Sequence, residues 1–126
     1  MVTSIVNQFV YRPDITSAPE GFTPADLWLD FESVSLRTAD GLTLSAWYIP
    51  SPNARLSLLY CHGNGGDIRD WVHAAPPFVE QGISFFVFDY RGYGRSEGFP
   101  SEKGLYLDGE AAWQWLLTQS EREDVP

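Results

Sequence analysis

The sequence contains one cysteine and one lysine, and the scarcity of cysteine already excludes some kinds of protein. Cys61 has no second cysteine to pair with, so no disulfide can form within the chain. One cysteine and two histidines also fall short of the four Cys and His ligands of a typical structural zinc site. We therefore expect no metal centre.

Basic residues in general are scarce. Eight Lys and Arg stand against 17 Asp and Glu, which gives a formal net charge of -9 at pH 7. Negative charge of this size repels phosphate backbones, and no basic stripe is present, so we exclude nucleic acid as a partner. The basic residues are dispersed along the chain, at Arg12, Arg37, Arg55, Arg69, Arg91, Arg95, Lys103 and Arg122.

Long apolar runs are missing as well. No stretch approaches the roughly 20 residues that a helix needs to span a bilayer. The segment from Met1 to Arg12 lacks the basic start and the uninterrupted apolar core of a signal peptide. We therefore expect a cytoplasmic protein with no membrane span.

The 126 residues are 44% hydrophobic and suffice for one domain, 1–126. Residues 1–30 hold three prolines and no sustained period, which indicates an irregular lead-in. The stretches 31–38 and 42–49 alternate between apolar and polar residues around the turn residues Ala39-Asp40-Gly41. This pattern predicts a β-hairpin over 31–49.

Two nearly continuous apolar runs, 56–61 and 83–88, predict strands that are buried on both faces. Helical spacing of apolar residues over 68–79 and again over 102–119 predicts two helices. Strands that alternate with helices indicate a parallel sheet with right-handed crossovers. The sequence thus predicts an α/β fold in which the hairpin precedes a β-α-β-α unit over 55–119, with its three layers incomplete.

Local signals refine both helices. Asp67 is placed to cap the start of the first one, and Pro76-Pro77 is expected to kink or split it. In the second helix we expect one apolar face, made of Leu105, Gly109, Ala112, Trp113 and Leu116.

A glycine-rich loop, Cys61-His62-Gly63-Asn64-Gly65-Gly66, lies between the first buried strand and the first helix. Backbone N–H groups at the start of a helix lack partners within it, so such a turn can hold an anion or a developing oxyanion. The same residues also suit a tight turn that needs glycine for its dihedral angles. The loop by itself does not decide between an anion site and a tight turn.

A second segment, Phe88-Asp89-Tyr90-Arg91-Gly92-Tyr93-Gly94-Arg95-Ser96-Glu97-Gly98, follows the next strand, and Pro100-Ser101-Glu102 comes after it. Together with the first loop and Asp108 in the last helix, these motifs resemble α/β-hydrolases of the serine type. The resemblance is to the branch described as BEM46-like or ABHD-like. It covers roughly residues 31–119, in the family's order, which corresponds to the amino-terminal half of the fold.

The resemblance implies a catalytic serine on a G-x-S-x-G elbow after the next strand, with the acid and the histidine later still. It also implies that Asn64 supplies one oxyanion N–H within the loop Gly63-Asn64-Gly65, while the residue after the nucleophile supplies the other. On this basis the 126 residues contain no catalytic residue and only half of an oxyanion hole.

Ser96 satisfies G-x-S-x-G literally, within Gly94-Arg95-Ser96-Glu97-Gly98, but we interpret it as a decoy. A nucleophile elbow needs a strand that runs directly into its first glycine and a helix that begins just after the serine. Here Arg91 to Tyr93 separate the strand from the motif, and Pro100 follows soon after it. We expect Ser96 to form hydrogen bonds within its loop.

The remaining candidates receive structural interpretations. We expect His62 to shape the glycine loop, His73 to belong to the first helix, and Cys61 to be packed at its strand end. A nucleophilic Cys61 beside His62 is disfavoured because adjacent residues of a strand face opposite sides. Neither glycine-rich loop completes G-x-G-x-x-G, and no P-loop motif is present, so we expect no nucleotide cofactor.

Two hypotheses of function remain. In the first, the chain is the amino-terminal portion of a hydrolase of ester, thioester or other acyl bonds, and is inactive alone. In the second, it is a non-enzymatic interaction or self-assembly module. The second depends on 56–61, which the resemblance makes a sheet edge and which can pair with a second copy or with a carboxy-terminal half.

Overall fold

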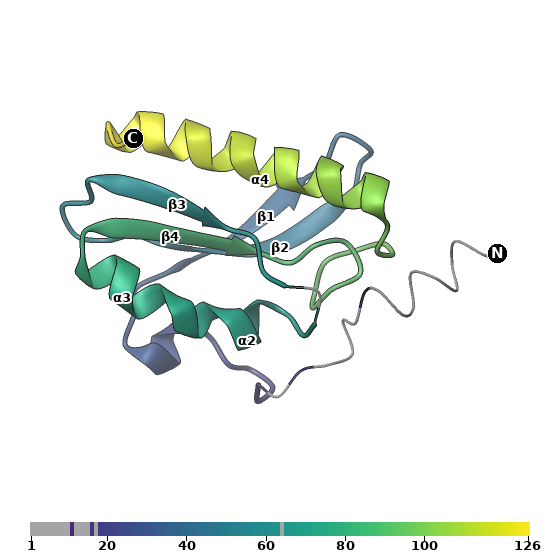
Figure 1. Ribbon diagram of the computed structural model, residues 1–126, viewed down its shortest axis with the longest axis horizontal. Coiled ribbons are helices and arrows are strands. Elements are labelled where there is room, and N and C mark those ends of the chain that lie inside the picture. Colours follow the sequence, from purple (N-terminus) through teal and green to yellow (C-terminus); the bar gives the residue numbers. More distant parts are fainter. Residues whose placement is uncertain (1–10, 12–15, 17, 64) are drawn as a thin grey trace.

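The computed structural model of the chain describes residues 11, 16, 18–63 and 65–126. A four-stranded sheet runs through the molecule in the order β1-β2-β4-β3. Figure 1 shows one long helix on one face of this sheet and shorter helices on the other. The strands are β1 (Glu32–Arg37), β2 (Thr43–Ile49), β3 (Leu56–Tyr60) and β4 (Ile83–Phe88).

The predicted hairpin is confirmed. Strands β1 and β2 pair antiparallel with Ser35 opposite Ser45. Their turn closes through the Gly41 N–H, which donates to the Thr38 carbonyl, and Gly41 has a φ of 90° that favours glycine. A 3-10 helix, η1 (Pro24–Leu27), lies within the predicted irregular lead-in.

The predicted parallel pairing is confirmed for β3 and β4, with Tyr60 opposite Val87, whereas β4 and β2 are antiparallel. Strand β4 is buried on both faces, as the sequence predicts. The same prediction is wrong for β3, where Leu56 is 41% exposed and the next four residues are half-buried. Strand β3 lies at the edge of the sheet, as the resemblance implies, and among the described residues β4 is its one strand partner.

The first predicted helix is divided into α2 (Ile68–Trp71), the 3-10 turn η2 (Val72–Ala74) and α3 (Ala75–Glu80). The predicted split therefore falls just before Pro76-Pro77, and these prolines lie in the first turn of α3. Proline is tolerated there because the first N–H groups of a helix have no intrahelical partner.

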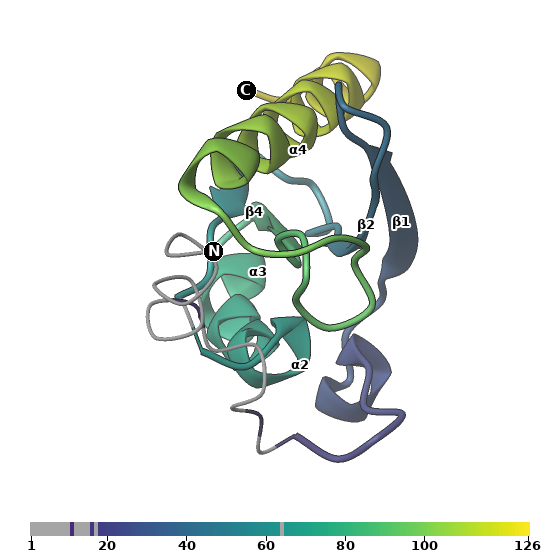
Figure 2. The same cartoon turned by 90° about the vertical axis from the view of Figure 1, so that its right-hand side faces the viewer.

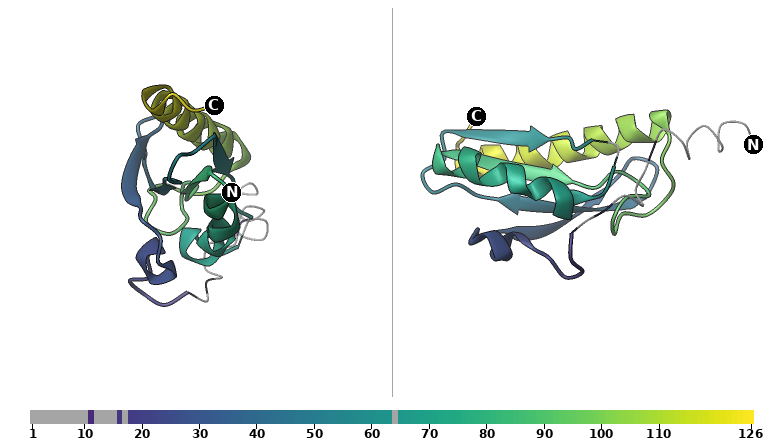
Figure 3. Two further views of the ribbon diagram at one scale, coloured as in Figure 1. Left: turned by 90° about the vertical axis from the view of Figure 1, so that its left-hand side faces the viewer. Right: turned by 60° about the horizontal axis from the view of Figure 1, so that its bottom comes forward.

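Two apolar clusters hold the layers together. The first fills the space between the sheet and α4 (Glu102–Glu123), the long helix in Figures 1 and 3. The second fills the space between the other face and α2 to α3. Successive residues of β4 serve them alternately: Phe86 and Phe88 join the first cluster, Phe85 and Val87 the second.

The predicted apolar face of the last helix is partly wrong. Trp113 is 51% exposed, whereas the buried stripe of α4 is spaced at four residues. The helix is turned this way because the buried stripe contains a carboxylate, Asp108, that pairs with an arginine beneath it. The buried residues are Gly104, Asp108, Ala112, Leu116 and Ser120.

Candidate functional site

The two glycine-rich loops meet at one end of the sheet. Because β3 and β4 are parallel, their carboxyl ends lie side by side, and the loops 61–67 and 89–101 both start there. Figure 2 looks onto this end of the molecule. Ligands of open α/β sheets bind at the carboxyl ends of the strands, so this end is the candidate site.

His62 and Asp89 connect the two loops. The His62 Nε2 atom lies 3.1 Å from Asp89 Oδ1, and both side chains are almost fully buried, at 0% and 3% exposure. On the other side of the ring, Nδ1 lies 2.6 Å from the carbonyl oxygen of Gly63. The predicted loop-shaping role of His62 therefore has a specific geometry in the structure.

Aromatic rings surround this histidine. The Trp71 ring from α2 stacks on it at 6.1 Å between centroids, while Tyr90 and Tyr93 meet it edge-on. Trp71 also donates its indole N–H to the Gly65 carbonyl at 2.9 Å. A Cβ atom on Gly63 would lie only 2.9 Å from the Trp71 ring, so a larger residue here would force that ring to shift.

The start of α2 corrects one part of the sequence analysis. Asp67 caps this helix as predicted, and its carboxylate accepts the N–H of Arg69 at 2.9 Å. The N–H of Ile68 donates to Asp89 Oδ1, and the N–H of Asp67 donates to Asp70. The expectation of unpartnered N–H groups is therefore wrong for these helix-start residues, because carboxylates already bind them.

Of the residues predicted to form the oxyanion hole, Gly63 and Gly65 lie on the loop beside Trp71. Asn64, the predicted donor, lies outside the described residues. Only Gly63 of the two is exposed, and Gly65 is half-buried.

Ser96 is held inside its own loop. Its hydroxyl donates to the Asp89 carbonyl at 2.6 Å and accepts the N–H of Ser45 at 2.9 Å. The residues after Ser96 are irregular, and the next helix, α4, begins only at Glu102. These bonds tie the second loop to β2.

Two further residues differ from their predicted surroundings. Cys61 was expected to be packed at the end of β3 but is exposed, because β3 is an edge strand. His73 does not lie within a continuous α-helix but in the η2 turn, where it is exposed and its ring contacts Phe22. The two ring nitrogens of His62 lie against Gly63 and Asp89, so His62 has no free nitrogen to activate Cys61.

A buried ion network fixes the second loop and was missed from the sequence. Arg91 donates from its backbone and its guanidinium to Asp108, and the guanidinium also binds Asp40 of the β1–β2 turn at 2.8 Å. Hydrogen bonds from this guanidinium hold the pKa of the Asp40 carboxyl well below its usual range. The sequence signal for this network was Asp108, a charged residue spaced four residues from Gly104 and from Ala112.

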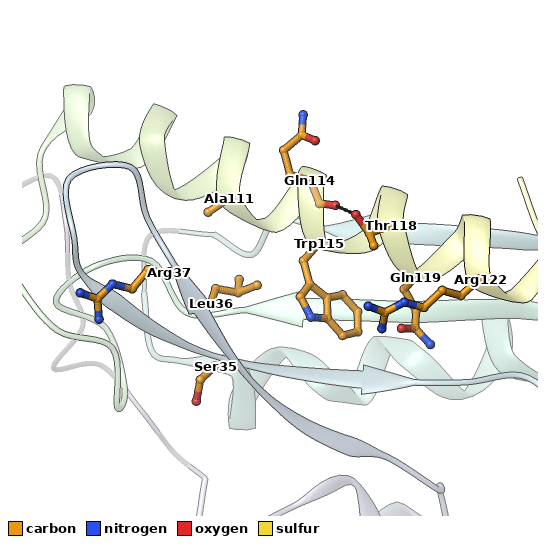
Figure 4. A pocket seen from close by; sticks show the side chains of 9 residues that line it. All are labelled: Ser35, Leu36, Arg37, Ala111, Gln114, Trp115, Thr118, Gln119 and Arg122. Atoms are coloured by element: carbon orange, nitrogen blue, oxygen red, sulfur yellow. Dashed lines mark hydrogen bonds between the residues drawn. The ribbon is translucent and has the colours of Figure 1, made fainter.

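Two hollows lie near these elements. A groove of about 1050 Å³ has Asp89, Asp67 and Arg69 in its wall, with Trp47 of β2 and Arg95. A smaller pocket of about 300 Å³ lies between β1 and α4, where the Trp115 ring points toward the sheet (Figure 4). Neither hollow, as defined by the described residues, is lined by Gly63 or Gly65.

Within the described part of the chain, no three His, Cys, Asp or Glu side chains are grouped so that they could hold a metal ion. The helices of that same part include none that is both long enough and apolar enough to cross a membrane.

Known proteins share both sequence and fold with this chain. An uncharacterised Mycobacterium tuberculosis protein is 42% identical over 116 residues, or 90% of this chain and 40% of that protein. Protein bem46 of Schizosaccharomyces pombe is 34% identical, over 92% of this chain and 44% of its own length. The chain thus spans about two fifths of the curated relatives it matches. No family model matches it.

Solved structures of an α/β-hydrolase and an esterase share the fold of this chain. An α/β-hydrolase from Vibrio vulnificus superposes with a TM-score of 0.73 at 25% identity, over 92% of this chain and 42% of that one. An esterase from Pyrococcus furiosus superposes with a TM-score of 0.62 at 22% identity, over 81% and 40%.

The open α/β sheet, with both glycine loops at the carboxyl ends of its parallel strands, matches the fold of these α/β-hydrolases. The chain belongs to the α/β-hydrolase family. Its homologues in this family include bem46.

Proposed function

We propose that the chain supplies half of the oxyanion hole of a serine hydrolase that acts on ester, thioester or other acyl bonds. In this proposal the backbone N–H groups of the loop Gly63-Asn64-Gly65 face the negative oxygen that develops during acyl transfer. The nucleophile, the acid, the base and the second donor come from residues outside these 126. A cytoplasmic location is part of the same proposal.

The observation that carries the proposal is the attachment of this loop to Asp89. Preorganised donors stabilise a transition state only when they are held in place before the reaction. The buried contact of His62 with Asp89 and the indole bond to Gly65 supply that support from two separate elements. Since the helix-start N–H groups of α2 are already bound by carboxylates, the donors that remain for a ligand belong to the loop itself.

Magnitudes explain why the chain alone is expected to be inactive. Loss of a catalytic serine or histidine lowers kcat by about a millionfold. The bonds of Ser96 support its interpretation as a structural residue of the loop rather than a nucleophile. Its hydroxyl donates to the Asp89 carbonyl, and the residue is 9% exposed. A hydroxyl held in this way lacks the general base that a nucleophilic serine needs.

The first test uses the chain alone. We expect no labelling by a fluorophosphonate probe, and no nitrophenyl-ester hydrolysis above the rate of a Ser96→Ala control. Labelling that disappears in Ser96→Ala would overturn both the decoy interpretation and the inactivity of the chain.

The second test completes the protein. The chain is co-expressed with the part of the Mycobacterium tuberculosis relative that it does not match, and nitrophenyl-ester hydrolysis is measured. Asn64→Pro removes the predicted backbone donor, whereas the control Asn64→Ala keeps it. If Asn64 donates to the oxyanion, Asn64→Pro lowers kcat about 100- to 1000-fold relative to Asn64→Ala. Equal rates in an active pair would contradict the assignment.

A second candidate function, self-assembly through the sheet edge, is favoured by β3. Among the described residues this strand has one strand neighbour, β4, and its first residue, Leu56, is 41% exposed. The N–H of Ser57 donates to the carbonyl of Pro126 at 2.9 Å, so one backbone group on the outward side of β3 already binds another part of the chain. Exposed apolar edges pair readily with further strands.

Sedimentation velocity over a range of concentrations tests this candidate. We expect self-association that Leu56→Lys weakens, because a lysine on an edge strand opposes pairing. Phe99→Lys adds the same charge at an 88% exposed residue of the loop before α4 and serves as the control. A wild-type chain that stays monomeric at all concentrations would contradict self-assembly.

A further inference from the structure

The contacts of His62 determine how many protons it shares with Asp89. The carbonyl oxygen of Gly63 can only accept a hydrogen bond, so the Nδ1 atom 2.6 Å away must carry a proton. The Nε2 atom lies 3.1 Å from Asp89 Oδ1, which also accepts the N–H of Ile68 at 2.9 Å. A proton must lie between Nε2 and Asp89, because two lone pairs at this separation repel each other.

Two arrangements satisfy both contacts. Either His62 is an imidazolium beside an Asp89 carboxylate, or a neutral His62 accepts a hydrogen bond from a protonated Asp89. Both hold one proton more than a neutral imidazole beside a carboxylate. Both also leave the pair without net charge, which suits a site where the side chains are 0% and 3% exposed.

We infer that His62 and Asp89 are positioning residues that share one proton, and that this proton holds the described part of the glycine loop in its observed geometry. When the proton is lost, His62 keeps only one N–H. It must then release either the Gly63 carbonyl or Asp89, and either loss removes one of the two contacts that hold the His62 ring in place. The inference rests on the proposed function only where it gives this loop a role in catalysis.

The environment favours keeping the proton. Burial raises the pKa of the Asp89 carboxyl, and its hydrogen bond with His62 opposes this rise. A raised carboxyl pKa means that the folded state retains a proton which the unfolded state has already lost. The stability that this proton contributes is present at low pH and is lost as the pH rises through the raised pKa of Asp89.

The groups that face the pair come from both loops and from α2, and none of them replaces the shared proton. Asp67 is neutralised by an ion pair with Arg69 at 2.7 Å. Burial raises the pKa of Tyr90 above its usual range, so Tyr90 stays neutral while the pair titrates. The described titratable and charged groups around the pair are Cys61, Asp67, Arg69, Asp70, Tyr90 and Tyr93.

Nuclear magnetic resonance of the intact chain tests the inference without turnover. The ring nitrogens of His62 and the amides of Gly63 and Gly65 are followed as the pH is raised. We expect the two glycine amides to change together with one midpoint when the pair loses its shared proton.

Asp89→Asn is the matched variant, because it keeps the shape of the side chain but cannot share a proton. We expect the common step of the Gly63 and Gly65 amides to be lost in this variant. The inference is overturned if wild-type His62 loses a proton while both amides stay still. It is also overturned if Asp89→Asn folds and keeps the common step. The wild-type titration decides the matter even if the variant does not fold.

Failure here and failure of the proposed function are distinguishable. The titration reports loop geometry in the chain alone, whereas the Asn64→Pro comparison reports catalysis in the completed protein. Coupled titration without ester hydrolysis would leave the proton-sharing pair in place and remove only its catalytic meaning.

Discussion

The guanidinium of Arg91 lies 2.8 Å from the carboxylate of Asp108, whose side chain is fully buried on α4. The same carboxylate accepts the backbone N–H of Arg91, also at 2.8 Å. One side chain of the helix thus fixes both the position and the charge of the loop after β4. This relationship ties the orientation of α4 to the geometry of the candidate site.

Replacement of Asp108 tests this coupling. Asp108→Ala removes the buried partner of Arg91 and is expected to lower the free energy of unfolding by about 3 to 5 kcal/mol. Asp40→Ala is the control, because it removes the exposed partner of the same guanidinium, and we expect a clearly smaller loss. Urea denaturation followed by circular dichroism measures both. Equal losses would mean that burial of the pair does not matter.

Two glycines of α4 give opposite predictions for the same change. A Cβ atom on Gly104 would lie 2.4 Å from Arg91 Cδ, whereas a Cβ atom on Gly109 meets nothing within 4 Å. Gly104→Ala is therefore expected to destabilise the protein by about 1 to 3 kcal/mol through overpacking. Gly109→Ala is expected to stabilise it by about 0.5 to 1 kcal/mol, because alanine loses less backbone entropy in a helix. Thermal or urea unfolding of the two variants measures the difference, and a stabilised Gly104→Ala would refute the packing argument.

The elements with strong periodicity could be predicted from the sequence. Strand β4 begins and ends where its apolar run does, and the hairpin is defined by alternation around Ala39-Asp40-Gly41. These signals succeed because each residue's burial follows from its own position in a strand.

The parts that could not be predicted depend on contacts between distant segments. The turn of α4 about its axis is set by Arg91 and Asp108, and periodicity treats Asp108 as a polar residue that should face water. The partners of the α2 N–H groups likewise include Asp89, 21 residues along the chain.

Core packing across the sheet is tested at Phe86. Its ring is fully buried and stacks on Trp115 of α4 at 4.6 Å between centroids. Phe86→Ala is expected to lower the free energy of unfolding by about 3 to 5 kcal/mol, because it leaves a cavity between the sheet and the helix. Phe99→Ala makes the same substitution at an 88% exposed position, where we expect a change within about 0.5 kcal/mol. Chemical denaturation compares them, and similar losses would contradict the assignment of the core.

Alkaline titration tests the contact between Tyr48 and Glu123. The Tyr48 hydroxyl donates to Glu123 near the end of α4, and the phenol ring is packed against Trp115. Burial, followed by the hydrogen bond to Glu123, raises the pKa of Tyr48 to about 12. In the wild type we expect Tyr48 to ionise above the usual pH for tyrosine, and in Tyr48→Phe this late step is absent. The near-ultraviolet absorbance of tyrosinate measures the difference.

The sign of the effect on stability follows from the direction of this shift. The folded state holds the Tyr48 proton more tightly than the unfolded chain, where a phenol has a pKa of about 10. Its contribution is therefore complete below pH of about 10 and is lost as the pH rises toward about 12. Tyr48→Phe should lose less stability than the wild type across this interval. Glu123→Gln should lower the pKa of Tyr48 but leave it raised, because burial is the larger cause. A return to the ordinary value in Glu123→Gln would show that Glu123, rather than burial, dominates.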